Sequence, residues 1–158
     1  MLAYLVRARP FNPIPMPTLV DNKEIVRRFA EEFINEGNYD TAAEFLAEDI
    51  ADHTPLGETT GREAVVETLK TVRTAFPDFV ITPREIVAED DTVAVRMIQR
   101  GTHEGTFLGI EPTGTAFEIE AMAFVRLEDG KIVERWGRPD LLGLLRQLGQ
   151  TEIPAPPA

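Results

Sequence analysis

The 158-residue sequence has no cysteine, only two histidines and a single tryptophan. The missing cysteines exclude disulfide bonds, thiolate metal ligands and a cysteine nucleophile. Two isolated histidines without an H-E-x-x-H motif argue against a zinc centre, so we expect no metal ion and no cofactor. The chain also has no G-x-S-x-G, P-loop or G-x-G-x-x-G motif, which argues against the enzyme and nucleotide-binding classes that carry them.

Long hydrophobic runs and basic charge are also scarce. The apolar run near the start, Leu2–Val6, is shorter than the roughly 7–15 residues of a signal peptide or the roughly 20 of a membrane span. The chain has 16 Lys and Arg residues and 27 Asp and Glu residues, which gives a formal net charge of -11. Such a surface repels phosphate backbones and anionic lipids, so we expect a soluble, cytoplasmic protein with neither nucleic acid nor membrane as partner.

The residues that are present fit one globular domain, because 43% are hydrophobic and 27% are charged. Four prolines between residues 10 and 18 each fix φ and favour extended backbone. Residues 1–18 are therefore predicted to form an extended arm, and the proline-containing residues 150–158 an irregular tail. The folded domain is expected over residues 19–149.

The first predicted helix has a capping-box pair, Asp21 and Glu24, ahead of apolar residues that recur at helical spacing. This helix is predicted over residues 22–36. Further helices are predicted from Asp40 through Leu46, from Thr60 to Phe76 ahead of Pro77, and over the apolar closing segment 139–149.

From Phe79 onward the hydrophobic period changes from that of a helix to that of a strand. Strands are predicted at Phe79–Ala88, Thr92–His103, Thr115–Leu127 and Lys131–Trp136. Asp129-Gly130, between the last two, is typical of a tight hairpin turn. This order predicts an α+β fold, with N-terminal helices packed on a curved, mostly antiparallel sheet that leaves a pocket at its open end.

Three phrases connect the chain to a known family: ADHTP at residues 51–55, GTHEGTFLGIEPTG at 101–114 and DGKIVERWGRPDLLGLLRQLG at 129–149. With the order of the elements, they resemble the SnoaL-like polyketide cyclases of the NTF2-like superfamily over about residues 21–149. The resemblance implies an NTF2-like, cone-shaped α+β barrel with an apolar pocket, which commonly forms a homodimer through its sheet. Because one fold serves many functions, the resemblance narrows the activity only weakly.

The sequence departs from the family at two positions. By the resemblance, the aldol cyclases use an acidic residue on the last strand as general acid/base, and Gly137 takes that position here. A pocket histidine that family members carry on the preceding strand is replaced by Ala123. Both substitutions argue against polyketide cyclisation by that mechanism.

His53 is the first candidate catalytic residue, because histidine has the side-chain pKa best suited to proton transfer near neutrality. It belongs to the Asp-His-x-Pro phrase, which by the resemblance lines the pocket. The alternative is a loop histidine that bonds only to backbone groups. His103 and Gln99 share the apolar face of one predicted strand, so they are expected either to bind substrate or to satisfy loop groups at the barrel rim.

The last strand supplies the remaining candidates. By the resemblance, Arg135 points inward with Gly137, and Asp140 is its expected acceptor in a catalytic charge pair. The alternative places Asp140 at the amino end of the closing helix, where a carboxylate is favoured. Trp136 is expected to wall the substrate pocket if the strand is bulged, and otherwise to lie in the sheet or in a dimer interface.

These residues favour a cofactor-independent acid/base enzyme, of the isomerase, lyase, cyclase or hydrolase type, acting on a small apolar molecule. His53 would be the base, with Arg135 and Gln99 placing the substrate oxygen. One alternative is a non-catalytic module that binds a small ligand or a partner. Another is a hydrolase of the limonene epoxide type, which is expected to use an Asp-Arg-Asp set of which Arg135 and Asp140 supply two members.

Overall fold

The computed structural model describes residues 19–150, so the predicted arm over 1–18 and the predicted tail beyond residue 150 lie outside the described residues. The elements, in chain order, are α1 (Leu19–Arg28) with a π-helical continuation (Phe29–Asn35), a 3₁₀ turn (Tyr39–Thr41), α2 (Ala42–Phe45), β1 (Leu46–Thr54), β2 (Gly57–Thr60), α3 (Arg62–Ala75), β3 (Val80–Glu89), β4 (Thr92–Thr102), β5 (Ala116–Glu128), β6 (Lys131–Pro139) and α4 (Leu141–Gln147). Within this part of the chain, no helix is long and apolar enough to cross a membrane.

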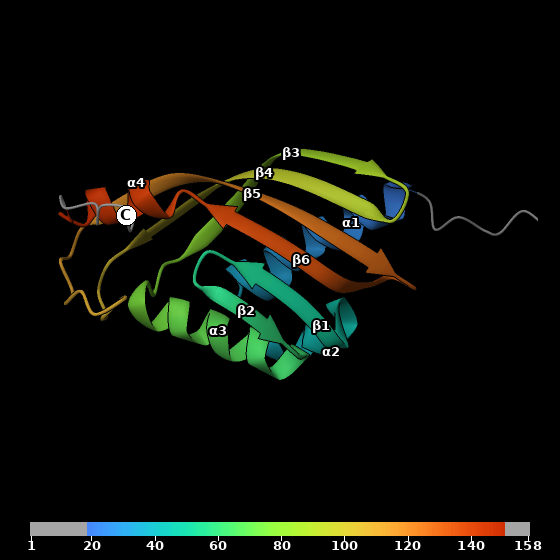
Figure 1. Ribbon diagram of the computed structural model, residues 1–158, viewed down its shortest axis with the longest axis horizontal. Helices are drawn as coiled ribbons and strands as arrows, with labels where there is room; N and C mark the ends of the chain where they lie inside the picture. Colours follow the sequence, from blue (N-terminus) through green and yellow to red (C-terminus); the bar gives the residue numbers. More distant parts are fainter. Residues whose placement is uncertain (1–18, 151–158) are drawn as a thin grey trace, which may run out of the picture.

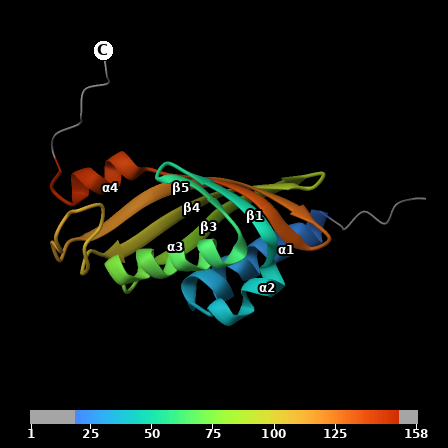
Figure 2. The same cartoon turned by 60° about the horizontal axis from the view of Figure 1, so that its bottom comes forward.

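Six strands form one sheet in the order β2-β1-β6-β5-β4-β3. Neighbouring strands are antiparallel except β1 and β6, which are parallel. The sheet is curved and open, and α1, α2 and α3 lie along one of its faces while α4 lies at one end (Figures 1 and 2). The predicted α+β fold, with N-terminal helices packed on a mostly antiparallel sheet, is confirmed.

The first helix packs an aromatic stripe against the inner face of the sheet. Phe29, Phe33 and Ile34 are buried, and the rings of Phe29 and Phe33 stack with centroids 5.1 Å apart. Phe45 from α2 meets the Phe29 ring edge-on at 5.9 Å. Burying such rings contributes a large part of the hydrophobic stabilisation of a small domain, and here it fixes the helix in the concavity of the sheet.

The hairpin between β5 and β6 has the turn that its sequence predicts. Asp129 and Gly130 both have positive φ, 48° and 75°. A two-residue turn with positive φ at both positions matches the right-handed twist of the flanking strands. The four predicted strands are present, and β6 continues beyond Trp136 as far as Pro139.

Two predictions about the segment between the helices were wrong. Residues 46–60 contain two strands, β1 and β2, that the sequence analysis did not predict. In β1 the exposed Glu48 and Asp49 interrupt the apolar alternation, and a buried inward position is taken by a charged residue, Asp52. Thr60 lies in β2 and does not cap α3, because Gly61, with a φ of 99°, makes the turn between strand and helix.

Candidate functional site

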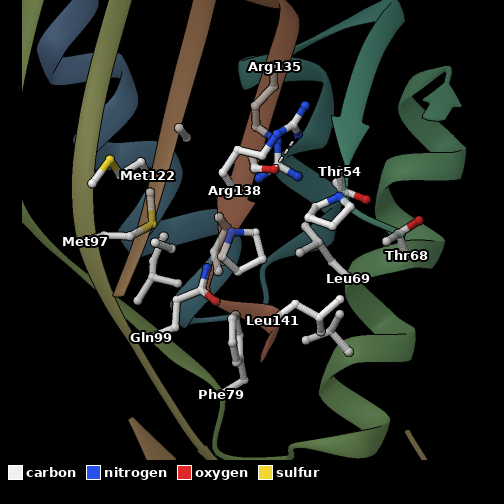
Figure 3. Close-up of a pocket in the computed structure, with 18 of the residues that line it drawn as sticks. Thr54, Thr68, Leu69, Phe79, Met97, Gln99, Met122, Arg135, Arg138 and Leu141 are labelled. Carbon is white, nitrogen blue, oxygen red and sulfur yellow. Dashed lines mark hydrogen bonds between the residues drawn. The ribbon is translucent and has the colours of Figure 1, made fainter. Parts of the chain in front are cut away.

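The inner face of the sheet and the helices enclose a cavity of about 330 Å³ (Figure 3). Most of its wall is apolar and comes from distant parts of the chain, including Phe29, Leu69, Phe79, Met97 and Leu141. The hairpin that joins β1 to β2, residues 54–59, forms part of the edge. Such a cavity suits a small apolar molecule whose few polar atoms are met by specific side chains.

Small residues give the cavity its depth on the β5–β6 side. Ala123 and Gly137 are direct neighbours across these strands, and both line the cavity. A Cβ atom added at Gly137 would meet only Cζ and Nη1 of Arg135, each at 4.0 Å, which is ordinary van der Waals contact. The two positions where the family resemblance places an acid and a histidine are therefore open space beside Arg135.

Arg135 is held by a buried carboxylate on the neighbouring strand. Its Nε donates to Oδ1 of Asp52 at 2.8 Å, and its Nη2 donates to Oδ2 at 2.7 Å. The Asp52 side chain is 1% exposed and that of Arg135 is 19% exposed. Two parallel bonds fix the plane of the guanidinium, because its donors match the two oxygens of a carboxylate.

The remaining nitrogen of this guanidinium, Nη1, has no hydrogen-bond partner within residues 19–150. Arg135 lines the cavity, as predicted, whereas its buried partner Asp52 does not. The cavity wall therefore presents cationic N–H donors in mostly apolar surroundings. In such surroundings a hydrogen bond to a negatively charged oxygen is stronger than in water.

The predicted pairing of Arg135 with Asp140 was wrong. Asp140 accepts a hydrogen bond from the backbone N–H of Gly143 at 2.8 Å and so caps α4. This is the alternative role considered from the sequence, and it follows from helix geometry, since the first N–H groups of a helix lack partners within it. Arg135 instead finds its carboxylate at the parallel register position on β1.

His53 lies on the outer face of the sheet and is not among the residues that line the cavity. Side chains alternate along β1, so the burial of Asp52 directs its neighbour His53 outward. The Nδ1 atom of His53 is 3.1 Å from Oε1 of Glu58, its Nε2 atom is 3.1 Å from Oε1 of Glu134, and its ring stacks on Trp136 at 5.4 Å. The prediction that His53 lines the cavity was wrong.

The two carboxylates favour the protonated form of His53. Hydrogen bonds to Glu134 and then Glu58 raise the pKa of His53 above its ordinary value. The same contact with His53, followed by that with Arg126, lowers the pKa of Glu134. Both ring nitrogens face acceptors, so this geometry suits the imidazolium, which donates from both.

Trp136 lies with His53 outside the cavity, so it does not wall the pocket. The strand is bulged, because Val133 is an extra residue between the pairs Leu127–Ile132 and Arg126–Glu134. This bulge lets both Ile132, which is fully buried, and Arg135 face inward. It ends before Trp136, whose side chain remains on the outer face.

Gln99 and His103 have different surroundings. Gln99 lines the cavity, and its amide has no hydrogen-bond partner within the described chain. His103 is fully buried away from the cavity wall, where its Nδ1 accepts the backbone N–H of Thr113 at 3.2 Å and its ring lies 5.4 Å from Phe76. His103 thus satisfies a loop group, which is the alternative considered from the sequence.

The sequence analysis missed two charged residues of the site. Asp52 stands in the ADHTP phrase, and its spacing of two from the buried Ile50 would have placed it inward if β1 had been predicted. Arg138 lines the cavity near the end of β6. Its Nη1 donates to the backbone carbonyls of His53 at 3.0 Å and of Gly137 at 2.8 Å.

Comparison with known proteins identifies relatives along nearly the whole described chain. Residues 24–148 match the family model described as SnoaL-like polyketide cyclase. Aklanonic acid methyl ester cyclase DnrD of Streptomyces peucetius is 33% identical over 142 residues, which cover 85% of this chain and 93% of that protein. Nogalonic acid methyl ester cyclase of Streptomyces nogalater is 30% identical, covering 73% of this chain and 88% of that protein.

A solved structure agrees with this assignment. Wild-type IdmH from Streptomyces antibioticus is similar with a TM-score of 0.73 and 33% sequence identity, and the match covers 81% of this chain and 98% of that one. The family model, the related cyclases and the fold all point the same way. The chain belongs to the SnoaL-like polyketide cyclase family.

Proposed function

We propose that the protein is a cofactor-independent cyclase that acts on a small apolar ketone, and that Arg135 stabilises negative charge on the substrate oxygen. The observation that carries this proposal is the Nη1 atom of Arg135, which faces a mostly apolar cavity without a partner in residues 19–150. The related proteins DnrD and nogalonic acid methyl ester cyclase are named as cyclases of methyl esters. The 33% and 30% sequence identity of these cyclases to this chain supports ring closure as the reaction.

Ring closure of this kind needs only proton transfers. A carbon next to one carbonyl loses a proton, and negative charge collects on that carbonyl oxygen. The carbon then bonds to a second carbonyl carbon, whose oxygen takes the charge and finally a proton. Substrate and product have the same composition, so no oxidant or cofactor is needed, and donors aimed at the charged oxygen lower the barrier.

Two further polar side chains have roles in this scheme. Asp52 is a positioning residue, because it holds the plane of the Arg135 guanidinium without lining the cavity. Gln99 lies toward the other end of the cavity and would bind a second oxygen of the substrate (Figure 3). Glu58 lies at the cavity edge, but its side chain is 81% exposed and its carboxylate is hydrogen-bonded to His53 on the outer face, so we assign no side chain as the proton acceptor.

The direct test is incubation with aklanonic acid methyl ester, the compound for which DnrD is named. Wild-type protein should form an isomer of unchanged mass, detected by liquid chromatography with mass spectrometry. The double variant Asp52→Asn/Arg135→Gln keeps the shape of the pair and removes both charges. We expect it to react about 10²–10³-fold more slowly, the usual cost of losing one oxyanion donor.

A matched control removes an arginine of the outer face. Arg100 pairs with Glu118 there at 2.6 Å, so Arg100→Gln should leave the rate unchanged. Melting temperatures of all variants show whether they fold. Absence of any ring-closed isomer from wild-type protein, or a double variant with the full rate, would contradict the proposed role of Arg135.

The second candidate function is a non-catalytic module that binds a small apolar ligand. The small residues Ala123 and Gly137 in the cavity wall favour this alternative, because by the family resemblance the aldol cyclases carry a histidine and an acidic residue at these positions. Tight binding of a ligand that is recovered unchanged after long incubation would support this alternative. The limonene epoxide type is disfavoured, since Arg135 has one carboxylate partner, Asp52, in the described chain.

A further inference from the structure

We infer that the substrate carries a carboxylate, and that Arg138 binds it at the edge of the cavity. This inference rests on the proposed function, because it concerns the same cavity. It defines the substrate as an apolar keto acid rather than the neutral ester named for the relatives.

Three charged residues line the cavity, and two of them have partners of opposite charge. Arg135 is paired with Asp52, and Glu58 is hydrogen-bonded to His53 on the outer face. Arg138 has hydrogen bonds only to backbone carbonyls, both from its Nη1 atom. Those oxygens carry no net charge, so within residues 19–150 the cation has no carboxylate partner.

The lack of a carboxylate partner contrasts with the arginines on the outer face of the same sheet. Three of these pair with glutamates: Arg96 with Glu85 and Glu120, Arg100 with Glu118, and Arg126 with Glu128 and Glu134. The chain has an excess of acidic residues and a net charge of -11. Of the two arginines that line the cavity, Arg138 is the one without a carboxylate partner within residues 19–150.

Arg138 is nonetheless held in place. Its Nη1 bridges the main chains of β1 and β6 through His53 and Gly137, which fixes the direction of the guanidinium. The Nε and Nη2 atoms have no partners among the described residues. These two nitrogens are the pair that binds both oxygens of Asp52 in the neighbouring Arg135, so the same bidentate geometry is open to a ligand carboxylate.

Both arginines serve one end of the cavity. Arg135 points inward from β6, whereas Arg138, three residues further along the strand, is exposed at the cavity edge. Figure 3 shows both at one end of the pocket, with Gln99 and Phe79 toward the other. A single ligand can then place its reacting oxygen at Nη1 of Arg135 and its carboxylate at Arg138. Its apolar body would extend toward Phe79.

The test compares two ligands that differ only in this charge, anthraquinone-2-carboxylate and its methyl ester. Binding to wild-type protein is measured by isothermal titration calorimetry at low and at high salt. The acid should bind about tenfold more tightly than the ester at low salt, as expected for one charge-assisted contact, and less so at high salt. Arg138→Gln should abolish this preference without weakening the ester, and Arg138→Lys should keep part of it.

Arg146→Gln is the matched control, because Arg146 lies on α4 and does not line the cavity. It should leave the preference intact. Equal binding of acid and ester by wild-type protein, or a preference that survives in Arg138→Gln, would overturn the inference. Ring closure of the methyl ester would in either case still support the proposed function. Failure of both ligands to bind, with no ring closure, would contradict both.

Discussion

The Asp52–Arg135 pair makes a sharp prediction about stability. In the single variant Arg135→Met, the Asp52 carboxylate loses both of its hydrogen bonds while it stays 1% exposed. Removing one partner of a buried ion pair typically costs about 3–5 kcal/mol. Since domains of this size are stable by about 5–15 kcal/mol, the single variant should lose a large part of its free energy of unfolding.

The double variant Asp52→Leu/Arg135→Met removes both charges, whereas Arg135→Met leaves the Asp52 carboxylate buried without a partner. Apolar replacements of buried ion pairs are often neutral or stabilising, so this variant should lie within about 1 kcal/mol of wild-type protein. Equilibrium unfolding in urea measures all three free energies on one scale. A single variant as stable as wild type, or a double variant as damaged as the single one, would refute the assignment of a dry, mutually dependent pair.

Three further outcomes are expected. His53→Gln should be destabilised relative to wild type most strongly below about pH 6.5, because only the imidazolium is favoured by its two carboxylates. The difference in stability should shrink as the pH rises through the raised pKa of His53. Thermal unfolding from about pH 5 to about pH 9 measures this difference, and a constant difference contradicts the prediction. Gly105→Ala should lower the free energy of unfolding, measured in urea, by about 3 kcal/mol, because the added Cβ atom would overlap the carbonyl oxygen of Thr74. An unchanged free energy of unfolding would mean that this loop does not lie against Thr74. The family resemblance implies a homodimer formed through the outer face of the sheet, where the 56% exposed ring of Phe124 lies beside Trp136. If that dimer forms, Phe124→Lys should convert the two-chain mass measured by light scattering to a one-chain mass. An unchanged mass would exclude this face as the interface.

Local patterns were sufficient to predict much of the fold. The alternation in β4 and β5 and the Asp129-Gly130 turn each depend on neighbours in the sequence, and both are present. The predicted helix start was wrong, because α1 begins at Leu19 and Asp21 lies within its first turn. Strand β1 was missed because its charged inward residue, Asp52, breaks the apolar alternation on which the prediction relied.

The site was predicted less well than the fold. Arg135 was correctly placed inward, but its partner lies 83 residues away on a parallel strand. Pairing between distant strands depends on sheet register, which a single sequence does not give. The same limit explains His53, because a shift of one residue along a strand moves a side chain to the opposite face of the sheet.

The most direct test of the central claim is a crystal structure with a ring-closed ketone product bound. The account predicts one ligand oxygen within about 2.7–3.1 Å of Nη1 of Arg135, the distance of an oxyanion donor, with the Asp52 bonds intact. It also predicts that the ring system covers Ala123 and Gly137. A ligand that leaves Nη1 facing only carbon atoms, or that binds outside this cavity, would contradict the claim.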